Sequence, residues 1–353
     1  MERAHLHFRP TLDSGEIEQG AARLLVPGPL DDPDLERRIA RIEERFRIYA
    51  ACSPHGLWAP GLVITREMRG IAEVYLPLAE IRRAVQRLFT LALRFEPFLP
   101  ASVVHGSASW PDTLHALHPL VREANPARLM RRLLADGEFR SRFLFSLFLP
   151  HRYGGAFGRY PAQLAFLANR LTAGRPKVAV RCLDAACGSG EGSYELAELL
   201  LECGYAPEKI TVHGTTVEAL ELFAAAHGWF PHDPARQAAF RRRIRPLFAK
   251  GAAARVAFSR EDLTGTGRDR QGEYDIILCN GLLGGPLLNG REELAGTVGR
   301  LCARLKAGGI LLAADRFHGG WKRSVPDDAL RSLLAGNGLR LLACGEGVAG
   351  VKD

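Results

Sequence analysis

The stretch that most constrains the fold is residues 180–192, where an apolar run breaks into small residues and then becomes helical. Residues 180–184 have the composition of a buried parallel strand. Gly188 and Gly190 allow the backbone to turn sharply and a ligand to come close. A strand, a glycine turn and a helix start make the first half of a nucleotide-binding βαβ unit. Asp184 ends the strand, at the edge where open α/β sheets bind ligands.

The residue after the glycines separates two classes of cofactor. A dinucleotide fingerprint has three glycines and seats a pyrophosphate on the N-terminus of the following helix. Here Gly190 is followed by Glu191, whose negative charge repels a pyrophosphate and attracts a cationic amino-acid group. The stretch therefore resembles motif I of class I S-adenosylmethionine (SAM) methyltransferases; a tight turn without a ligand is the alternative. We expect the loop to bind SAM through Asp184, Ala186, Cys187, Gly188, Ser189, Gly190 and Glu191.

Composition narrows the class of protein. The chain of 353 residues is long enough for one large or two ordinary domains. Its seven cysteines form no CxxC pair and have no metal-ligand spacing with histidine, so we expect reduced thiols and no metal. The N-terminus lacks the apolar core of a signal peptide, and no apolar run is long enough to span a membrane. We therefore expect a cytoplasmic protein without a membrane partner.

Two regions of different pattern divide the chain near residue 150. Residues 1–30 carry turn formers and little periodicity, which predicts an irregular arm, and helical stripes follow. From residue 151 onward strands alternate with helices, as in a doubly wound, mostly parallel sheet. One predicted helix, 291–306, ends at a basic turn followed by two glycines. We predict an α/β fold with a Rossmann-like SAM-binding domain at 151–353 and a separate all-helical domain before it.

Residues after the second and third strands continue the predicted site. In a SAM site the residue that ends the second strand usually holds the ribose hydroxyls, and a carboxylate suits this because it accepts two hydrogen bonds at once. Thr216 takes that position here, so we expect Thr216, Val217 and Glu218 to line the ribose, with Glu218 supplying the carboxylate. Asp262 and Leu263 follow the third strand and suit adenine, as an acceptor for its amino group and an apolar contact.

In their order along the chain, these segments resemble the CheR family, whose members methylate glutamates of chemotaxis receptors. The likeness covers roughly residues 155–318 and is carried by Phe157-Gly158-Arg159, Cys187-Gly188-Ser189-Gly190-Glu191-Gly192-Ser193-Tyr194, Thr216-Val217-Glu218 with the helix that follows, and Asp275-Ile276-Ile277-Leu278-Cys279-Asn280. The resemblance implies a SAM-binding methyltransferase domain. It also implies that Arg159 and Glu191 contact the amino-acid end of SAM, while Asp262 and Leu263 contact adenine.

Three departures from the family pattern bear on the acceptor. Thr216 stands where the family has its ribose aspartate, and Gly285 stands where it has a tyrosine. The segment 231–256 is too short for the subdomain that holds the receptor's tail peptide. Chemoreceptors are therefore not the expected acceptor, because the resemblance supports the fold and the cofactor but not the substrate.

We expect a SAM-dependent methyltransferase that acts on a protein carboxylate or a small molecule, with Arg159 and Asn280 as its catalytic residues. Asn280 ends the fourth strand, beside the expected place of the reactive methyl group. The N-terminal domain, 1–150, is expected to select the acceptor. A nucleic-acid acceptor is an alternative, favoured by the net charge of +8 and the arginines in 241–245. A SAM-binding regulatory module without turnover is the other alternative, because of the family departures described above.

Overall fold

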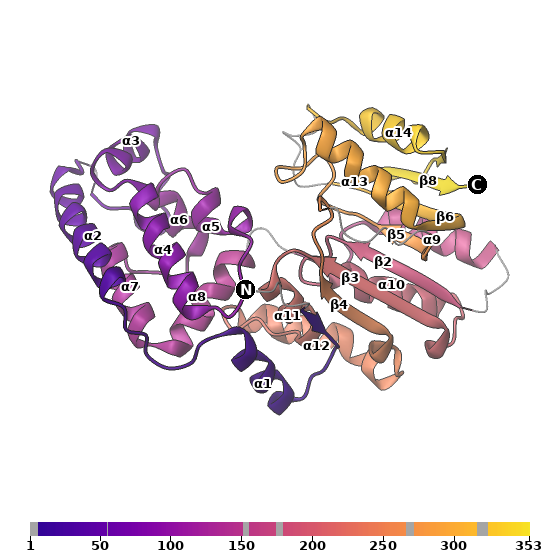
Figure 1. The fold of residues 1–353 in the computed structure, drawn as a ribbon, viewed down its shortest axis with the longest axis horizontal. Helices are drawn as coiled ribbons and strands as arrows, with labels where there is room; N and C mark the ends of the chain where they lie inside the picture. Colours follow the sequence, from indigo (N-terminus) through magenta and orange to yellow (C-terminus); the bar gives the residue numbers. More distant parts are fainter. Residues whose placement is uncertain (1–5, 55, 151–154, 174–178, 266–271, 316–323) are drawn as a thin grey trace. The chain divides into compact units, whose positions relative to one another are not determined.

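The computed structural model describes residues 6–54, 56–150, 155–173, 179–265, 272–315 and 324–353, and the chain forms two compact units (Figure 1). The helical unit holds the described residues within 12–150 and 229–238. The sheet unit holds those within 6–11, 155–228 and 239–353. No helix in these ranges combines the length and the hydrophobicity that a membrane span requires.

Helices fill the first unit. They are α1 (Ser14–Leu24), α2 (Pro33–Cys52), α3 (Arg66–Tyr75), α4 (Leu78–Ala92), η1 (Leu99–Ala101), α5 (Val103–Gly106), α6 (Trp110–Leu117), α7 (Pro126–Ala135) and α8 (Gly137–Phe148). Helix α2 begins where the sequence predicts, since Asp32 accepts a hydrogen bond from Leu35 N–H and Pro33 takes the first helical position. Its stripe of Leu35, Ile39 and Ile42 is buried in the core of the unit.

The N-terminal residues are not the irregular arm that their sequence predicts. Strand β1 (His7–Phe8) pairs antiparallel with β4 (Val256–Arg260), with His7 opposite Ser259, and Phe8 packs edge-on against Phe223. Helix α1 follows and begins at Asp13, whose carboxylate accepts from Glu16 N–H. The domain boundary predicted at residue 150 assigns β1 to the helical domain, whereas β1 belongs to the sheet unit.

A mixed sheet of eight strands is the centre of the second unit (Figure 1). Its strand order is β1-β4-β3-β2-β5-β6-β8-β7. The strands from β4 to β6 pair in parallel, whereas β1 pairs antiparallel with β4, and β8 pairs antiparallel with both β6 and β7. The strands not yet given are β2 (Val180–Ala185), β3 (Ile210–Thr216), β5 (Tyr274–Leu278), β6 (Leu305–Ala313), β7 (Leu339–Leu342) and β8 (Val348–Lys352). Because β3 and β5 flank β2, the strand order reverses at β2, where doubly wound folds bind ligands.

Helices cover both faces of this sheet. They are α9 (Pro161–Ala173), α10 (Glu191–Glu202), η2 (Pro207–Lys209), α11 (Ala219–His227), α12 (Pro234–Ala249), η3 (Ala252–Arg255), α13 (Arg291–Arg304) and α14 (Asp327–Gly336); α12 begins in the helical unit. Leu183, Ala185 and Ile277 share a buried core with α13 and α14. Asp184 faces the other side, towards α10, because side chains alternate along a strand. The predicted α/β architecture is thereby confirmed.

The end of α13 differs from the sequence prediction. The helix ends at Arg304, and Gly308 and Gly309 lie within strand β6 rather than after the helix. The pairing of β6 with β5 is irregular near Tyr274, and a Cβ on Gly309 would lie 3.0 Å from the Tyr274 carbonyl oxygen. These glycines therefore accommodate a bulged strand instead of stopping a helix.

The two ends of α10 offer a matched test of packing at the glycine turn. Gly190 and Gly204 have φ of +87° and +86°, but a Cβ on Gly190 would lie 2.7 Å from Ala225 Cβ, whereas one on Gly204 meets no described atom within 4 Å. We expect Gly204→Ala to destabilise the fold by about 1–2 kcal/mol, from backbone strain alone. Gly190→Ala should cost about 1–3 kcal/mol more, because it also overpacks the core. Equal losses in urea unfolding of the two variants would contradict this.

Candidate functional site

The loop after β2 has an unusual backbone and an open surface. Ala186, Gly188 and Gly190 all have positive φ, which is strained for the alanine. Cys187 N–H donates to the Thr215 carbonyl at 2.8 Å, which attaches the loop to the end of β3. A Cβ built on Gly188 meets no heavy atom of the described residues within 4 Å. The loop is therefore attached to the end of β3 on one side, and it leaves open space for a ligand at Gly188.

Asp184 lies behind this loop as a buried carboxyl group. Its side chain accepts a hydrogen bond from Ser193 Oγ at 2.7 Å, and a Cβ on Gly192 would lie 3.0 Å from its Oδ2. Burial, together with the nearby charges of Glu191 and Glu195, raises the pKa of Asp184 to about 7, although the Ser193 hydrogen bond lowers it. The carboxyl group thus changes charge near neutral pH.

The first turns of α10 hold two further acidic side chains. Glu191 is 4% exposed and accepts from Ser189 Oγ at 2.7 Å. A Cβ on Gly155 would overlap the Glu191 carboxylate, and Gly158 N–H donates to Glu195. Residues 155–158 therefore lie directly on the start of α10. Arg159 is the next residue in the chain and is half-buried. Its predicted contact with SAM stays a prediction.

The end of β3 corrects one predicted contact. Glu218 is 0% exposed and caps α11, accepting from Leu220 N–H at 3.1 Å, so its carboxylate does not face a ligand. Thr216 Oγ1 instead donates to Glu221 Oε2 at 2.8 Å. Val217 is half-buried, and its carbonyl accepts from Arg260. The sequence analysis missed Glu221, which the onset of α11 at Ala219 would have placed in the first helical turn.

The loop after β4 carries the two residues predicted to contact adenine. Asp262 is exposed, and its Oδ1 accepts from Thr264 N–H at 2.9 Å and Thr264 Oγ1 at 2.6 Å, which forms a local turn. The Leu263 carbonyl accepts from two Arg300 nitrogens at 2.9 and 2.7 Å, while its side chain packs against the core. Arg300 on α13 thus fixes this loop at the same edge of the sheet.

Asn280, just after β5, has a structural partner that the sequence did not reveal. Its side chain and that of Gln163 form a reciprocal amide pair, with N···O distances of 2.8 and 3.2 Å. The same Asn280 oxygen accepts from Ala314 N–H at 2.8 Å, and Gln163 is only 1% exposed. The pair therefore joins α9 to the ends of β5 and β6, and Asn280 acts first as a positioning residue.

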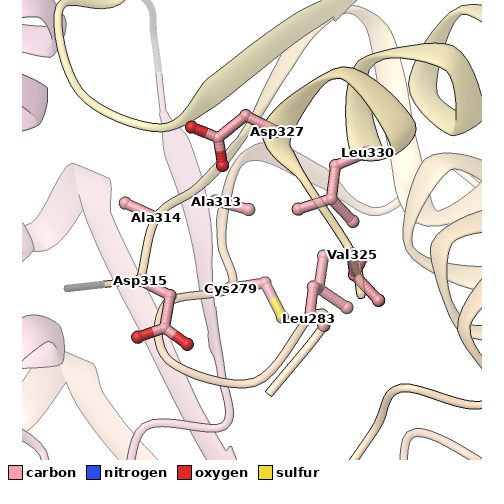
Figure 2. A pocket seen from close by; sticks show the side chains of 9 residues that line it. Cys279, Leu283, Ala313, Ala314, Asp315, Val325, Asp327 and Leu330 are labelled. Atoms are coloured by element: carbon pink, nitrogen blue, oxygen red, sulfur yellow. The ribbon is translucent and has the colours of Figure 1, made fainter. Parts of the chain in front are cut away.

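A small pocket opens at the carboxyl ends of β5 and β6 (Figure 2). Its wall consists of Cys279, Leu283, Gly284, Ala313, Ala314, Asp315, Val325, Asp327 and Leu330. Figure 2 shows Asp315 and Asp327 on one side and the apolar side chains of Leu283, Val325 and Leu330 on the other. Cys279 belongs to the core shared with α13, whereas Asp184 faces α10. None of the nine is a predicted site residue. Cys279 directly precedes Asn280, and burial and the charge of Asp184 raise the pKa of its thiol.

The charges around the glycine loop fit SAM and not a pyrophosphate. Asp184, Glu191 and Glu195 lie close enough that the charges of the two glutamates raise the pKa of Asp184, and Glu191 contributes to raising the pKa of Glu195. A cationic ligand would relieve this repulsion, and SAM carries both an ammonium and a sulfonium group. The open face at Gly188 would admit it. Together these residues would hold the amino-acid end of SAM.

Comparisons with known proteins agree with this cofactor. Residues 156–312, less than half of the chain, match the family model described as the CheR methyltransferase, SAM binding domain. No curated protein matched the chain.

Solved structures with a partial likeness include the cyclase SpnF, an O-methyltransferase family protein from Burkholderia thailandensis, and a Haemonchus contortus phosphoethanolamine N-methyltransferase bound to S-adenosylhomocysteine. Their identities are 21%, 16% and 17%, and their TM-scores are 0.35, 0.34 and 0.34. The matches cover 55%, 55% and 57% of this chain, but only 62%, 56% and 41% of those chains. The acceptors of those proteins therefore give no information on the acceptor here.

Titration of Asp184 should appear in the pH dependence of stability. Its pKa is about 7 in the folded protein and about 3.9 in an unfolded chain, so between these values the folded state binds more protons. Stability from this group is complete below about pH 4 and is lost as pH rises through about 7. We expect the wild type to lose up to about 1.4 kcal/mol per pH unit more than Asp184→Asn between pH 5 and 6.5. Parallel curves for the two proteins in urea unfolding would contradict this.

The amide pair should couple two sites that are 117 residues apart in sequence. Removing either partner leaves the other amide, buried at Gln163 and half-buried at Asn280, without its partner's hydrogen bonds, which costs about 1–3 kcal/mol. We expect Gln163→Ala and Asn280→Ala each to destabilise the fold by that amount. The double variant should be less destabilised than their sum by about 1 kcal/mol or more, measured by urea unfolding. Additive losses would show that the pair does not act as a unit.

Proposed function

We propose that this protein, whose residues 156–312 match the model of the CheR SAM-binding domain, is a SAM-dependent methyltransferase. Its proposed acceptor is an already ionised group, such as a carboxylate, of a protein or small molecule. The observation that carries the proposal is the chemistry of Asn280. Its side chain is a neutral amide whose oxygen and nitrogen are both used by Gln163 and Ala314. Asn280 therefore cannot remove a proton from an acceptor.

An ionised acceptor needs no such base. A carboxylate has lost its proton at pH 7, whereas a hydroxyl or amide acceptor requires general-base assistance. When bound, SAM supplies a methyl group on a cationic sulfur, which an ionised oxygen can take directly. The task left to the protein is to orient the two partners, and positioning alone can lower a barrier by several kcal/mol.

Different residues would orient the cofactor and the acceptor. Asp184, Glu191 and Glu195 would hold the cationic end of the cofactor, and the Asn280–Gln163 pair fixes the edge of the sheet beside it. Arg159, which directly follows residues 155–158 in the chain, would orient the carboxylate of the cofactor or of the acceptor by paired hydrogen bonds. The helical unit remains as the part of the chain that would select the acceptor.

A nucleic-acid acceptor receives less support from the arginines around residue 243. Arg241 donates to the carbonyls of Gly228 and His227, and Arg243 pairs with Glu198. These two guanidinium groups stabilise the sheet unit itself. Arg242 and Arg245 are exposed, as on an ordinary solvated helix face.

Transfer of labelled methyl groups tests the proposed acceptor class. We expect the protein to move label from SAM into the protein or small-molecule fraction of a cell extract, and mild alkali should release it as methanol because carboxyl methyl esters hydrolyse readily. Gly188→Asn should reduce transfer at least about tenfold, since asparagine tolerates a positive φ but fills the open face of the loop.

Gly204→Asn is the matched control, because Gly204 also has a positive φ and open space but lies at the other end of α10. It should retain most of the transfer. Alkali-stable label, or label in the nucleic-acid fraction, would overturn the proposed acceptor while leaving the methyltransferase activity in place.

A further inference from the structure

We propose that Glu221, oriented by Thr216, is the carboxylate that recognises the ribose hydroxyls of SAM in this protein. The assignment rests on the proposed SAM site and concerns one interaction within it. It replaces the role that the sequence predicts for Glu218.

The position of Thr216 leads to this assignment. Thr216 is the last residue of β3, next to β2 in the sheet, and the preceding Thr215 carbonyl accepts from Cys187 N–H of the glycine loop. In nucleotide-binding α/β folds, an acidic residue after the second strand holds the ribose hydroxyls. A threonine hydroxyl has a single hydrogen to donate, and here it is directed at Glu221 Oε2, 2.8 Å away. The carboxylate of Glu221, on α11, thus lies at the end of β3.

The Glu221 carboxylate lies close to the ligand loop. It is one of the charges that raise the pKa of the Cys187 thiol, after burial and Asp184. The side chain is half-buried, unlike that of Glu218, which is fully buried. A carboxylate can accept about four hydrogen bonds, so the bond from Thr216 is compatible with acceptance from a ribose diol.

The start of α11 explains why the acid is five residues beyond Thr216. The helix begins at Ala219, so Glu218 becomes its N-cap and its carboxylate turns back to Leu220 N–H. Glu221 then lies in the first turn, where a negative charge is stabilised by the helix dipole. Thr216 fixes the rotamer of the glutamate, as a hydroxyl neighbour commonly does for a functional carboxylate.

Calorimetry with two ligands tests the assignment. We expect Glu221→Gln to weaken binding of S-adenosylhomocysteine by about tenfold or more, because the charge-assisted hydrogen bonds to the ribose are lost. The same variant should bind the 2′,3′-dideoxy analogue of S-adenosylhomocysteine, which lacks both hydroxyls, within about threefold of the wild type. A ligand-dependent loss of this kind is not expected from a carboxylate that merely stabilises the helix.

Glu218→Gln is the matched control, since it carries the same change three residues away. It should alter the affinity for both ligands by less than about threefold while lowering the midpoint of thermal unfolding. If Glu221→Gln fails to fold, Thr216→Val provides the second test, because it removes the donor and keeps the shape. It should weaken binding of S-adenosylhomocysteine several-fold more than binding of the 2′,3′-dideoxy analogue.

Three results would overturn the assignment. One is wild-type affinity of Glu221→Gln for S-adenosylhomocysteine, and another is an equal loss for both ligands. The third is a ligand-dependent loss in Glu218→Gln instead. A wild-type protein that binds neither ligand would refute the SAM site as a whole, which is a distinguishable failure of the proposed function.

Discussion

The buried carboxyl group of Asp184 is the constraint on which the sheet unit depends. It is the penultimate residue of β2, accepts from Ser193 of α10, and leaves little space for a side chain at Gly192. Gly214, its neighbour on β3, is more confined, since a Cβ there would lie 2.6 Å from the Phe258 ring and 2.7 Å from Ser193 Oγ. Two strands and a helix thus close around one ionisable group. Because burial disfavours its charged form, a cation must come from the ligand side if Asp184 is to ionise fully at neutral pH.

The parts of the fold that the sequence predicts are those set by local pattern. The run at 180–184, its glycine turn and the leucine-rich helix after it can be recognised without knowing their partners. Strand β1 cannot, because two residues carry little periodicity and His7 pairs with Ser259, 252 residues away. The sequence prediction for Gly308 and Gly309 is wrong because it too depends on a pairing between distant strands. A glycine pair after a basic turn is typical of a helix stop, but the register with β5 places it inside a strand.

The predicted ribose contact shows how the exact residue at which a helix begins decides which side chain reaches a ligand site. From the sequence, Glu218 is the nearest acid after the second strand. Helix α11 begins at the next residue, so the Glu218 carboxylate accepts a hydrogen bond from Leu220 N–H at the start of the helix. The side chain of Glu218 stays buried in this position. Glu221 falls on the side of the helix that faces Thr216. Boundaries of this kind depend on tertiary packing, and the sequence pattern locates them only to within a few residues.

The start of α10 shows how one architecture can favour a cationic ligand where related ones favour an anion. A helix N-terminus presents free N–H groups and a positive dipole, so it commonly binds phosphate. Here Gly190 is the N-cap of α10 and offers no side-chain cap, and Glu191 supplies a negative charge in the first turn. Glu195 adds a second charge one turn later. The negative charges of Glu191 and Glu195 therefore disfavour a pyrophosphate at this helix N-terminus and favour the cationic groups of SAM.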